Sequence, residues 1–281
     1  MIVAGLLLTV NDGILKWLTG GYPIGQLMFL RGLFVFLPIS FFIWWAGGIH
    51  HMRIVNLKGQ FYRAVLVVIG TFCFVTGLAY LPLADAIAIT FAGPLFVTAM
   101  ASLFLKEIVG WRRWAAVFVG FMGVMIIIRP TGDAIQWAAL LPFATSLTGA
   151  LRDIITRHIA GGEQSVTILT VTTAFVCLAG LATSPFGWQS VSLGDLSLFL
   201  ISGLLMGGGH FLAIDAFRYA EAALVTPFKY TNIIWGIILG FLVWDDLPDL
   251  WTITGSIIVV SSGFYILSRE TKKKRDEQVG S

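Results

Sequence analysis

Apolar stretches of about 17–23 residues follow one another along the whole chain, and this repetition constrains the fold more than any other feature. A helix needs about 20 apolar residues to cross the hydrocarbon core of a bilayer, so each stretch has the length of a span. Of the 281 residues, 57% are hydrophobic and only 12% are charged, whereas about a quarter are charged in an ordinary soluble domain. The sequence therefore predicts an all-α, multi-pass protein in contact with the lipid bilayer, with no room for a separate soluble domain.

Proline, glycine and charged residues divide the apolar stretches into ten helices with short connections. The first stretch, MIVAGLLLTV, has no basic region before it, and Asn11–Asp12 stands where a signal peptide needs small residues, so we expect a retained span. The ten predicted helices cover approximately residues 1–18, 24–45, 61–81, 85–105, 114–129, 134–156, 165–184, 196–217, 222–244 and 251–268.

The basic residues indicate how these helices are oriented, because cytoplasmic segments of membrane proteins carry an excess of Lys and Arg. With a cytoplasmic N-terminus, the inside segments and the adjoining helix ends hold all the basic residues except Lys16, Arg31, Arg129 and Lys229. We therefore expect both termini in the cytoplasm and the chain in the inner, cytoplasmic membrane of a bacterial-type cell. The basic tail is interpreted as an anchor of this topology or as a patch that binds anionic lipid.

Two stretches of the chain align without gaps and indicate an internal repeat. The segment 80–107 lines up on 219–246, pairing Tyr80 with Tyr219 and Glu107 with Asp246. Each unit contains five helices, an odd number, so the second copy must cross the membrane in the opposite sense. The alignment predicts two five-helix repeats of inverted topology, an arrangement that places the substrate of many secondary transporters near the bilayer midplane between the halves.

The same repeat relates two polar turns. NDGILK (11–16) aligns with RDIITR (152–157), so each copy holds an Asp followed four residues later by a base. On a helix this spacing places acid and base on one face. The predicted domains are 1–131 and 132–268, one five-helix repeat each, followed by the basic cytoplasmic tail 269–281.

Several motifs resemble the EamA-type drug/metabolite transporter superfamily over essentially the whole chain. They are the ten-helix arrangement, GPL at 93–95, the helix-ending acids Glu107 and Asp246, and VGFMGVMIIIRP at 119–130. NDGILKWL, FLRGLF, RRWAAVFVGFMGV and AFRYAEAALVTPFKY look most like the branch of uptake carriers described for riboflavin and S-adenosylmethionine. The resemblance implies a carrier with a central cavity that alternates its exposure, a small-molecule substrate and no cofactor.

Polar residues near the middle of the first two spans are candidate substrate ligands, because an ionisable group in a span is costly unless it is paired or faces water. Asn11 and Asp12 lie roughly 16 Å along the first helix. Arg31 lies in the second helix, and its guanidinium fork suits a carboxylate or phosphate. The structural alternatives are an Asp12–Lys16 pair that lets the helix insert and an Arg31–Asp12 pair between helices.

Other charged residues lie nearer the predicted cytoplasmic end and are interpreted as gate or ion-pair residues. Arg152 and Asp153, followed by Arg157 one turn later, suit an ion pair or gate on the cytoplasmic side. Lys16 lies nearer the outer interface, where it could also form a gate or ion pair or extend its ammonium group to the membrane surface. Asp215 and Lys229 flank one inner loop and could pair, or Lys229 could face the substrate.

Helix-breaking and aromatic residues mark further candidates. Pro94 and Pro227 predict helix kinks at matching places in the two repeats. Each kink either exposes backbone to a cavity or only serves the packing of the helices. His210 follows three glycines and is a ligand or a buried core histidine. Around these positions the sequence has polar and aromatic side chains that could line a binding surface for a planar ligand: Phe91, Tyr230, Asn232 and Trp235. The alternative is that these side chains pack against lipid.

Motifs for other functions are absent from the sequence. It has no P-loop, dinucleotide-binding glycine pattern, HExxH or Cys/His metal spacing, and nothing indicates nucleic-acid binding. GIILG (236–240) has the spacing of helix packing, within the chain or between two copies as in a homodimer. The sequence therefore predicts a carrier and not an enzyme, with riboflavin uptake first and S-adenosylmethionine uptake second. The alternatives are an exporter of aromatic amino acids or drugs and, in another class, an intramembrane enzyme or membrane scaffold.

Overall fold

The computed structural model describes residues 1–45, 48, 54–104, 110–129, 135–159, 165–219 and 226–279. Within these ranges the chain is all-helical and has no β-strand. The elements are α1 (Ile2–Leu18), α2 (Ile24–Trp45), α3 (Leu57–Tyr80), α4 (Leu83–Thr90), α5 (Gly93–Phe104), α6 (Trp111–Ile128), α7 (Ile135–Ile159), α8 (Ser165–Leu181), η2 (Ser184–Phe186), α9 (Leu193–Tyr219), η3 (Thr226–Tyr230), α11 (Thr231–Trp244) and α12 (Leu250–Val279).

Seven stretches in the described part of the chain are long and apolar enough to cross a membrane, and two shorter apolar helices, Val166–Leu181 and Phe228–Trp244, accompany them. When α4–α5 and η3–α11 are each counted as one broken helix, the described elements correspond to the ten predicted segments. The prediction of an all-α, multi-pass membrane fold is confirmed at this level.

The fourth predicted helix, 85–105, is not continuous, since the structure divides it into α4 and α5 at Phe91 and Ala92. Pro94 has no N–H to donate to the carbonyl of Thr90, so the regular helical bond is lost there. The amides of Phe91 and Ala92 instead donate to carbonyls three residues earlier, at 3.2 and 3.0 Å. The ninth predicted helix is divided in the same way, because the 3₁₀ segment η3, which contains Pro227, precedes α11.

Glycines let the helices approach closely at two prolines. A Cβ on Gly207 of α9 would lie 2.2 Å from Cγ of Pro38 in α2, and one on Gly77 of α3 would lie 3.0 Å from Cδ of Pro142 in α7. Of the three glycines before His210, Gly207 and Gly209 are used for close packing, against Pro38 and Leu8, and α9 continues through all three as a helix. Van der Waals contact between such small residues drives association of helices in lipid.

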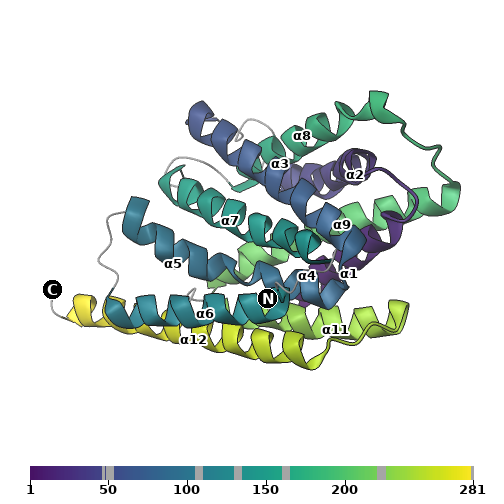
Figure 1. The fold of residues 1–281 in the computed structure, drawn as a ribbon. Helices are drawn as coiled ribbons and strands as arrows, with labels where there is room; N and C mark the ends of the chain where they lie inside the picture. Colours follow the sequence, from purple (N-terminus) through teal and green to yellow (C-terminus); the bar gives the residue numbers. More distant parts are fainter. Residues whose placement is uncertain are drawn as a thin grey trace.

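The helices pair in a regular scheme (Figure 1). α6 packs along α12 at one edge of the bundle, α2 packs along α8, and α1–α9 and α3–α7 form two further extensive pairs. α4 and α5 contact α7, while α11 contacts α1. This scheme brings α1, α2, α3, α7, α9 and η3 around the interior that holds most of the candidate polar residues.

Two other predictions about packing can be compared with the structure. α12 continues as a helix to Val279, through most of the predicted tail 269–281, because its Lys, Arg, Glu and Gln residues favour helix. In GIILG, a Cβ on Gly236 would lie 2.9 Å from Cδ1 of Ile87, so this glycine packs α11 on α4 within the chain. The homodimer stays a prediction.

Candidate functional site

A buried hydrogen-bonded group joins α1 to α9. The Ser202 hydroxyl donates to Oδ1 of Asn11 at 2.6 Å, and Nδ2 of Asn11 donates to Oδ1 of Asp12 at 3.0 Å. Asn11 and Ser202 are 3% and 0% exposed. A spanning helix would insert more easily without these groups. Asn11 thus orients the Asp12 carboxyl group while being held by the partner helix.

Arg31 of α2 lies beside this group. It is 4% exposed, its Nε has no hydrogen-bond partner, and Nη2 contacts only the weakly accepting Sδ of Met28 at 3.6 Å. The guanidinium interacts electrostatically with Asp12 and with Cys177 of α8, but no ion-pair contact joins Arg31 to Asp12. Arg31 therefore contributes buried, largely unused donors. We call Asn11, Asp12, Arg31 and Ser202 the central polar cluster.

A second group of cations lies next to the central polar cluster. His210 of α9 is within electrostatic range of Arg31, Arg63 and Arg152, and its Nδ1 lies 3.0 Å from the Met206 carbonyl oxygen. Nε of Arg63 in α3 donates to the Thr156 hydroxyl at 2.8 Å, and its Nη1 donates to the Thr172 hydroxyl. Arg63 therefore ties α3 to α7 and α8 through neutral partners.

The predicted gate residues are placed as follows. Arg152 donates from Nε and Nη2 to Oδ1 of Asp153 at 2.9 and 2.8 Å, so this pair lies within one helix and is about half-exposed. Lys229 lies within electrostatic range of both residues. The side chains of Arg157, Asp215 and Pro227 lie outside the part of the chain whose side chains are described.

Lys16 is directed away from Asp12. Its Nζ donates to the carbonyl oxygens of Leu81 at 2.5 Å and Leu78 at 3.3 Å, and it lies 5.4 Å from the centre of the Trp244 ring. These carbonyls end α3, where the negative end of the helix dipole favours a cation. Lys16 therefore links α1 to the end of α3, beside a cavity of about 340 Å³.

The two helix breaks meet in the interior. The rings of Phe91, at the α4–α5 break, and Tyr230, at the end of η3, have centres 4.9 Å apart, and Tyr230 also stacks on Phe264 at 5.2 Å. Asn232 packs on α1, since a Cβ on Gly5 would lie 2.1 Å from its Oδ1. Nε1 of Trp235 and Oδ1 of Asn232 are buried without hydrogen-bond partners.

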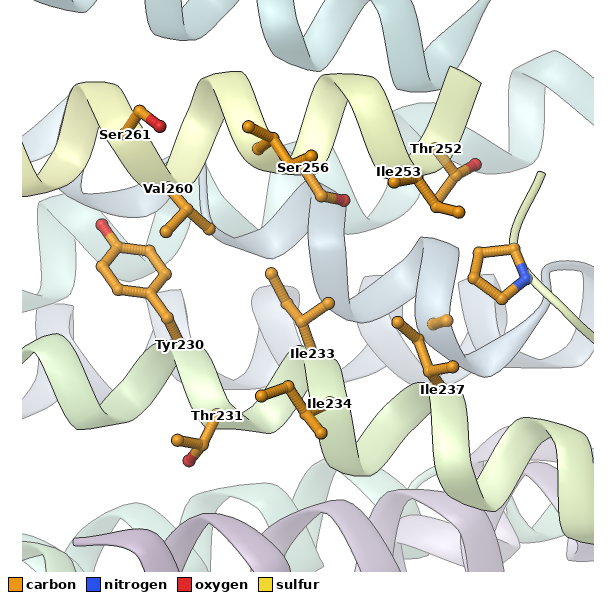
Figure 2. Close-up of a pocket in the computed structure, with 13 residues that line it drawn as sticks. Tyr230, Thr231, Ile233, Ile234, Ile237, Thr252, Ile253, Ser256, Val260 and Ser261 are labelled. Atoms are coloured by element: carbon orange, nitrogen blue, oxygen red, sulfur yellow. The ribbon is translucent and has the colours of Figure 1, made fainter. Parts of the chain in front are cut away.

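Figure 2 shows a groove of about 390 Å³ between α11 and α12. Tyr230 lines it from the end of η3, Ile233 and Ile237 from α11, and Thr252, Ser256 and Val260 from α12. The side chains of Ile234, Ile253 and Ile257, which also line it, are largely exposed. The groove is mostly apolar and contains none of the central polar cluster, so it is separate from the candidate site.

Specific contacts tie the helix ends around Lys16. The Tyr22 hydroxyl donates to Oδ2 of Asp195 at 2.7 Å, and this hydrogen bond raises the pKa of Tyr22 above its ordinary value. Gln26 is paired twice with the backbone of Gln189, donating to its carbonyl oxygen at 2.7 Å and accepting from its amide at 2.9 Å. These bonds hold α2 and the start of α9 together at this end.

An ion pair joins α6 to α12 at the same end. Arg129 contacts Asp249, and its hydrogen bond holds the pKa of the Asp249 carboxyl group below the ordinary value. Oδ1 of Asp249 also accepts the Thr252 amide at 2.9 Å, which caps α12.

Sequence reasoning did not single out all the polar residues of the site. In the sequence, Arg63 is one of the basic residues near the predicted cytoplasmic ends of the helices, and Ser202, Thr156 and Thr172 carry no charge that marks them in an apolar stretch. Buried polar groups on separate helices need hydrogen-bond partners. The few polar residues of 196–217 are therefore candidate partners for Asn11, and this argument could have identified Ser202 from the sequence. Within the described ranges no cluster of His, Cys, Asp and Glu suits a metal ion.

Comparisons with known proteins agree with the predicted resemblance. Residues 1–129 match the model of the EamA-like transporter family. A riboflavin transporter from Rhizobium johnstonii is 31% identical over 98% of this chain and 92% of its own length. An S-adenosylmethionine uptake transporter from Rickettsia bellii is 26% identical over 75% of this chain and 72% of its own.

A solved crystal structure shares the fold, with a TM-score of 0.65 at 14% identity over 92% of this chain and 93% of that chain. The family model, the whole-length relatives and the helical fold together confirm the predicted resemblance. The chain is a multi-pass membrane protein and belongs to the EamA-like transporter family.

Proposed function

We propose that this chain is a secondary transporter that moves a small organic metabolite across the bacterial inner membrane by alternating access. The observation that carries the proposal is the central polar cluster, a buried set of hydrogen-bonding groups contributed by α1, α2 and α9 inside an apolar bundle. Such groups are expensive in a membrane and mark substrate pathways. No cofactor is needed for this function.

The proposed mechanism uses two inverted repeats, 1–131 and 132–268, with both termini in the cytoplasm. The helix pairing supports it, because exchanging the helices of one half for their sequence equivalents in the other leaves the scheme unchanged. α1–α9 then becomes α7–α3, while α2–α8 and α6–α12 are each retained. The alignment also pairs Phe91 with Tyr230, and these rings are in contact at the two helix breaks.

Gating in this proposal occurs at the two ends of the bundle. The contacts of Lys16, Tyr22 and Gln26 close the end that we assign to the outside. Arg152 and Asp153 control the opposite, cytoplasmic end, where the pair is half-exposed. Transport then requires the outer contacts to break while the inner end closes.

Riboflavin is the first proposed substrate and S-adenosylmethionine the second. The relatives that bear those names support this order, since the riboflavin transporter has the higher identity and covers more of the chain. A planar ring system also suits the contact between the Phe91 and Tyr230 rings, on which the partly exposed Phe264 ring stacks.

The test is uptake into vesicles that hold the purified full chain. Labelled riboflavin, S-adenosylmethionine and tryptophan are supplied with and without a pH gradient, and flux is measured in both directions. We expect riboflavin to enter wild-type vesicles at least tenfold faster than empty ones. Ser202→Ala should reduce the rate because it leaves Oδ1 of Asn11 without its buried donor.

The matched control is Ser197→Ala, which removes the hydroxyl of an exposed serine of the same helix that bonds only to its own backbone. Equal rates in vesicles with and without protein for all three compounds would refute the transporter. Export of tryptophan without riboflavin uptake would favour the exporter. Turnover of a lipid headgroup that Asp12→Asn abolishes, with transport intact, would favour the intramembrane enzyme.

A further inference from the structure

We propose that the transported ligand carries a carboxylate or phosphate group, which is bound between Arg31 and Arg63. This inference rests on the proposed function and names the substrate class of the same site; it favours S-adenosylmethionine, which has a carboxylate, over riboflavin, which has neither a carboxylate nor a phosphate. The argument uses the hydrogen bonds of the two arginines, the charges around them and the absence of a protein anion that would balance them among the described residues.

Arg31 has the donors for such a group. A guanidinium presents five N–H donors and cannot give up its charge. At Arg31, Nε is unpartnered and Nη2 has only a thioether contact, although the side chain is 4% exposed. Leaving a buried donor unpaired is costly, so an acceptor is expected here when the site is loaded. A carboxylate or phosphate fits the fork with two parallel hydrogen bonds.

Arg63 is a second cation whose hydrogen-bond partners are neutral, with the Asp153 carboxylate in electrostatic range. Its hydrogen bonds go to the hydroxyl groups of Thr156 and Thr172, neither of which offsets its charge. The two threonines hold the guanidinium in place between α3, α7 and α8. Both arginines lie near α8, since Nη1 of Arg63 donates to the Thr172 hydroxyl and Cys177 packs on Gly32 next to Arg31, and His210 is in electrostatic range of both.

The charges of this region do not balance. Arg31, Arg63 and Arg152 stand against Asp12 and Asp153, and Arg152 already uses Asp153. Among the side chains that the structure describes, Asp12 is therefore the acid left for two arginines, and it makes no ion-pair contact with either. Excess charge of one sign at low dielectric is stabilised by a counter-charge, which an anionic ligand supplies.

Matched pairs of small molecules test the charge of the ligand. The purified full chain is placed in nanodiscs, and binding is measured by equilibrium dialysis for riboflavin against riboflavin 5′-phosphate, adenosine against its 5′-phosphate, and tryptamine against tryptophan. In at least one pair we expect the member with the carboxylate or phosphate to bind at least tenfold more tightly. If no member binds, or if charge makes no difference in any pair, the inference is overturned.

Variants then assign the preference to the two arginines. Arg31→Gln and Arg63→Gln should each reduce a tenfold preference to less than about threefold, since each removes one cation. Arg112→Gln, which removes an exposed arginine at the start of α6, should leave it unchanged. Arg63 is only partly buried, so Arg63→Gln keeps the test informative if Arg31→Gln does not fold. An unchanged preference in Arg63→Gln would contradict the assignment.

The lipid composition separates a small-molecule anion from a lipid headgroup. The dialysis is repeated with phosphatidylglycerol in the nanodiscs, and the preference should persist if the site takes a small molecule. Its loss would show that a headgroup occupies the arginines and would overturn the substrate class. The outcomes also separate the two proposals. If riboflavin is transported and no pair shows an anion preference, the transporter proposal stands and this inference fails. If the anionic member binds but nothing is transported, the anion site between the arginines stands and the transporter proposal fails.

Discussion

The two ends of the helix bundle are built differently. At one end, which we call the Lys16 end, side chains bond across helices to backbone or carboxylate groups: Lys16 to the end of α3, Gln26 to Gln189, and Tyr22 to Asp195. At the other, the Arg63 end, Arg152 and Asp153 bond within one helix and are half-exposed, and Arg63 bonds to hydroxyl groups.

The difference indicates which end is closed. Contacts to backbone carbonyls and amides fix the relative positions of helices, because the backbone cannot move without its helix. A side-chain pair within one helix sets no such constraint. In the proposed transport cycle we assign this structure to the form that is closed at the Lys16 end, and that cycle must break several bonds there.

The largest expected effect comes from Lys16→Met, which keeps an unbranched apolar stem and removes the ammonium group. A hydrogen bond that involves a charged group contributes about 1.5–3 kcal/mol, so the closed form should lose about 10- to 100-fold in population. Spin labels on Gly20→Cys and Ala79→Cys, in a chain with its two native cysteines replaced, should report a longer distance between α1 and α3.

Lys58→Met provides the matched control, since it makes the same chemical change at an exposed position of α3. It should leave the distance distribution unchanged. A distribution in Lys16→Met that coincides with the wild-type one would contradict the view that Lys16 holds this end closed.

Gln26→Leu should have the next largest effect. It removes both hydrogen bonds to Gln189, whose exposed backbone can then bond to water. We therefore expect the unfolding free energy to fall by about 1.4 kcal/mol and the Gln189 amide hydrogen to exchange roughly tenfold faster. Gln60→Leu is the counterpart in α3, because Gln60 is 1% exposed and its amide atoms have no partners. That variant should be neutral or more stable, and equal losses in both would contradict the comparison.

At the Arg63 end, the double variant Thr156→Val and Thr172→Val should cost about 1 kcal/mol or less in unfolding free energy. Valine keeps the shape and removes both acceptors of Arg63, but this arginine is only partly buried and water can replace them. Thermal unfolding of the purified chain measures the effect. A larger loss than in Gln26→Leu would show that the Arg63 end is the more firmly held one.

Much of the fold follows from the sequence because membrane spans depend on length and composition. The break at Phe91 was not placed, although Pro94 marked its neighbourhood, since a proline can bend a spanning helix without dividing it. Which helices pair depends on packing between distant segments. Gly207 against Pro38 illustrates this, since neither residue indicates its partner.

The candidate site was less predictable than the fold. Asn11 and Arg31 stood out because they are polar in apolar stretches, whereas the partners of each depend on where the helices lie. The spacing of Asp12 and Lys16 predicted one shared face, but Lys16 reaches the carbonyl oxygens of Leu78 and Leu81 on α3. A long side chain near a helix end has several acceptors in reach, and only the tertiary structure selects one.

The smallest expected effect concerns Asp249, which marks the Lys16 end without closing it. The hydrogen bond from Arg129 lowers the pKa of Asp249 in the folded chain. The carboxylate therefore stabilises the fold at pH values above its unfolded pKa of about 3.9. This stabilisation is lost as the pH falls through the lower pKa of the folded chain. Both side chains are more than a third exposed, so the contribution is about 1 kcal/mol at most.

Asp249→Asn keeps an acceptor for the Thr252 amide and removes only the charge. Its melting temperature should therefore lie slightly below that of the wild type at pH 7 and coincide with it once the pH is below the folded pKa of Asp249, while Asp245→Asn, at an exposed neighbouring acid, should show no such convergence. A difference that persists at low pH would show that Asp249 acts through its shape and capping bond, and the charge would then have no part in joining α6 to α12.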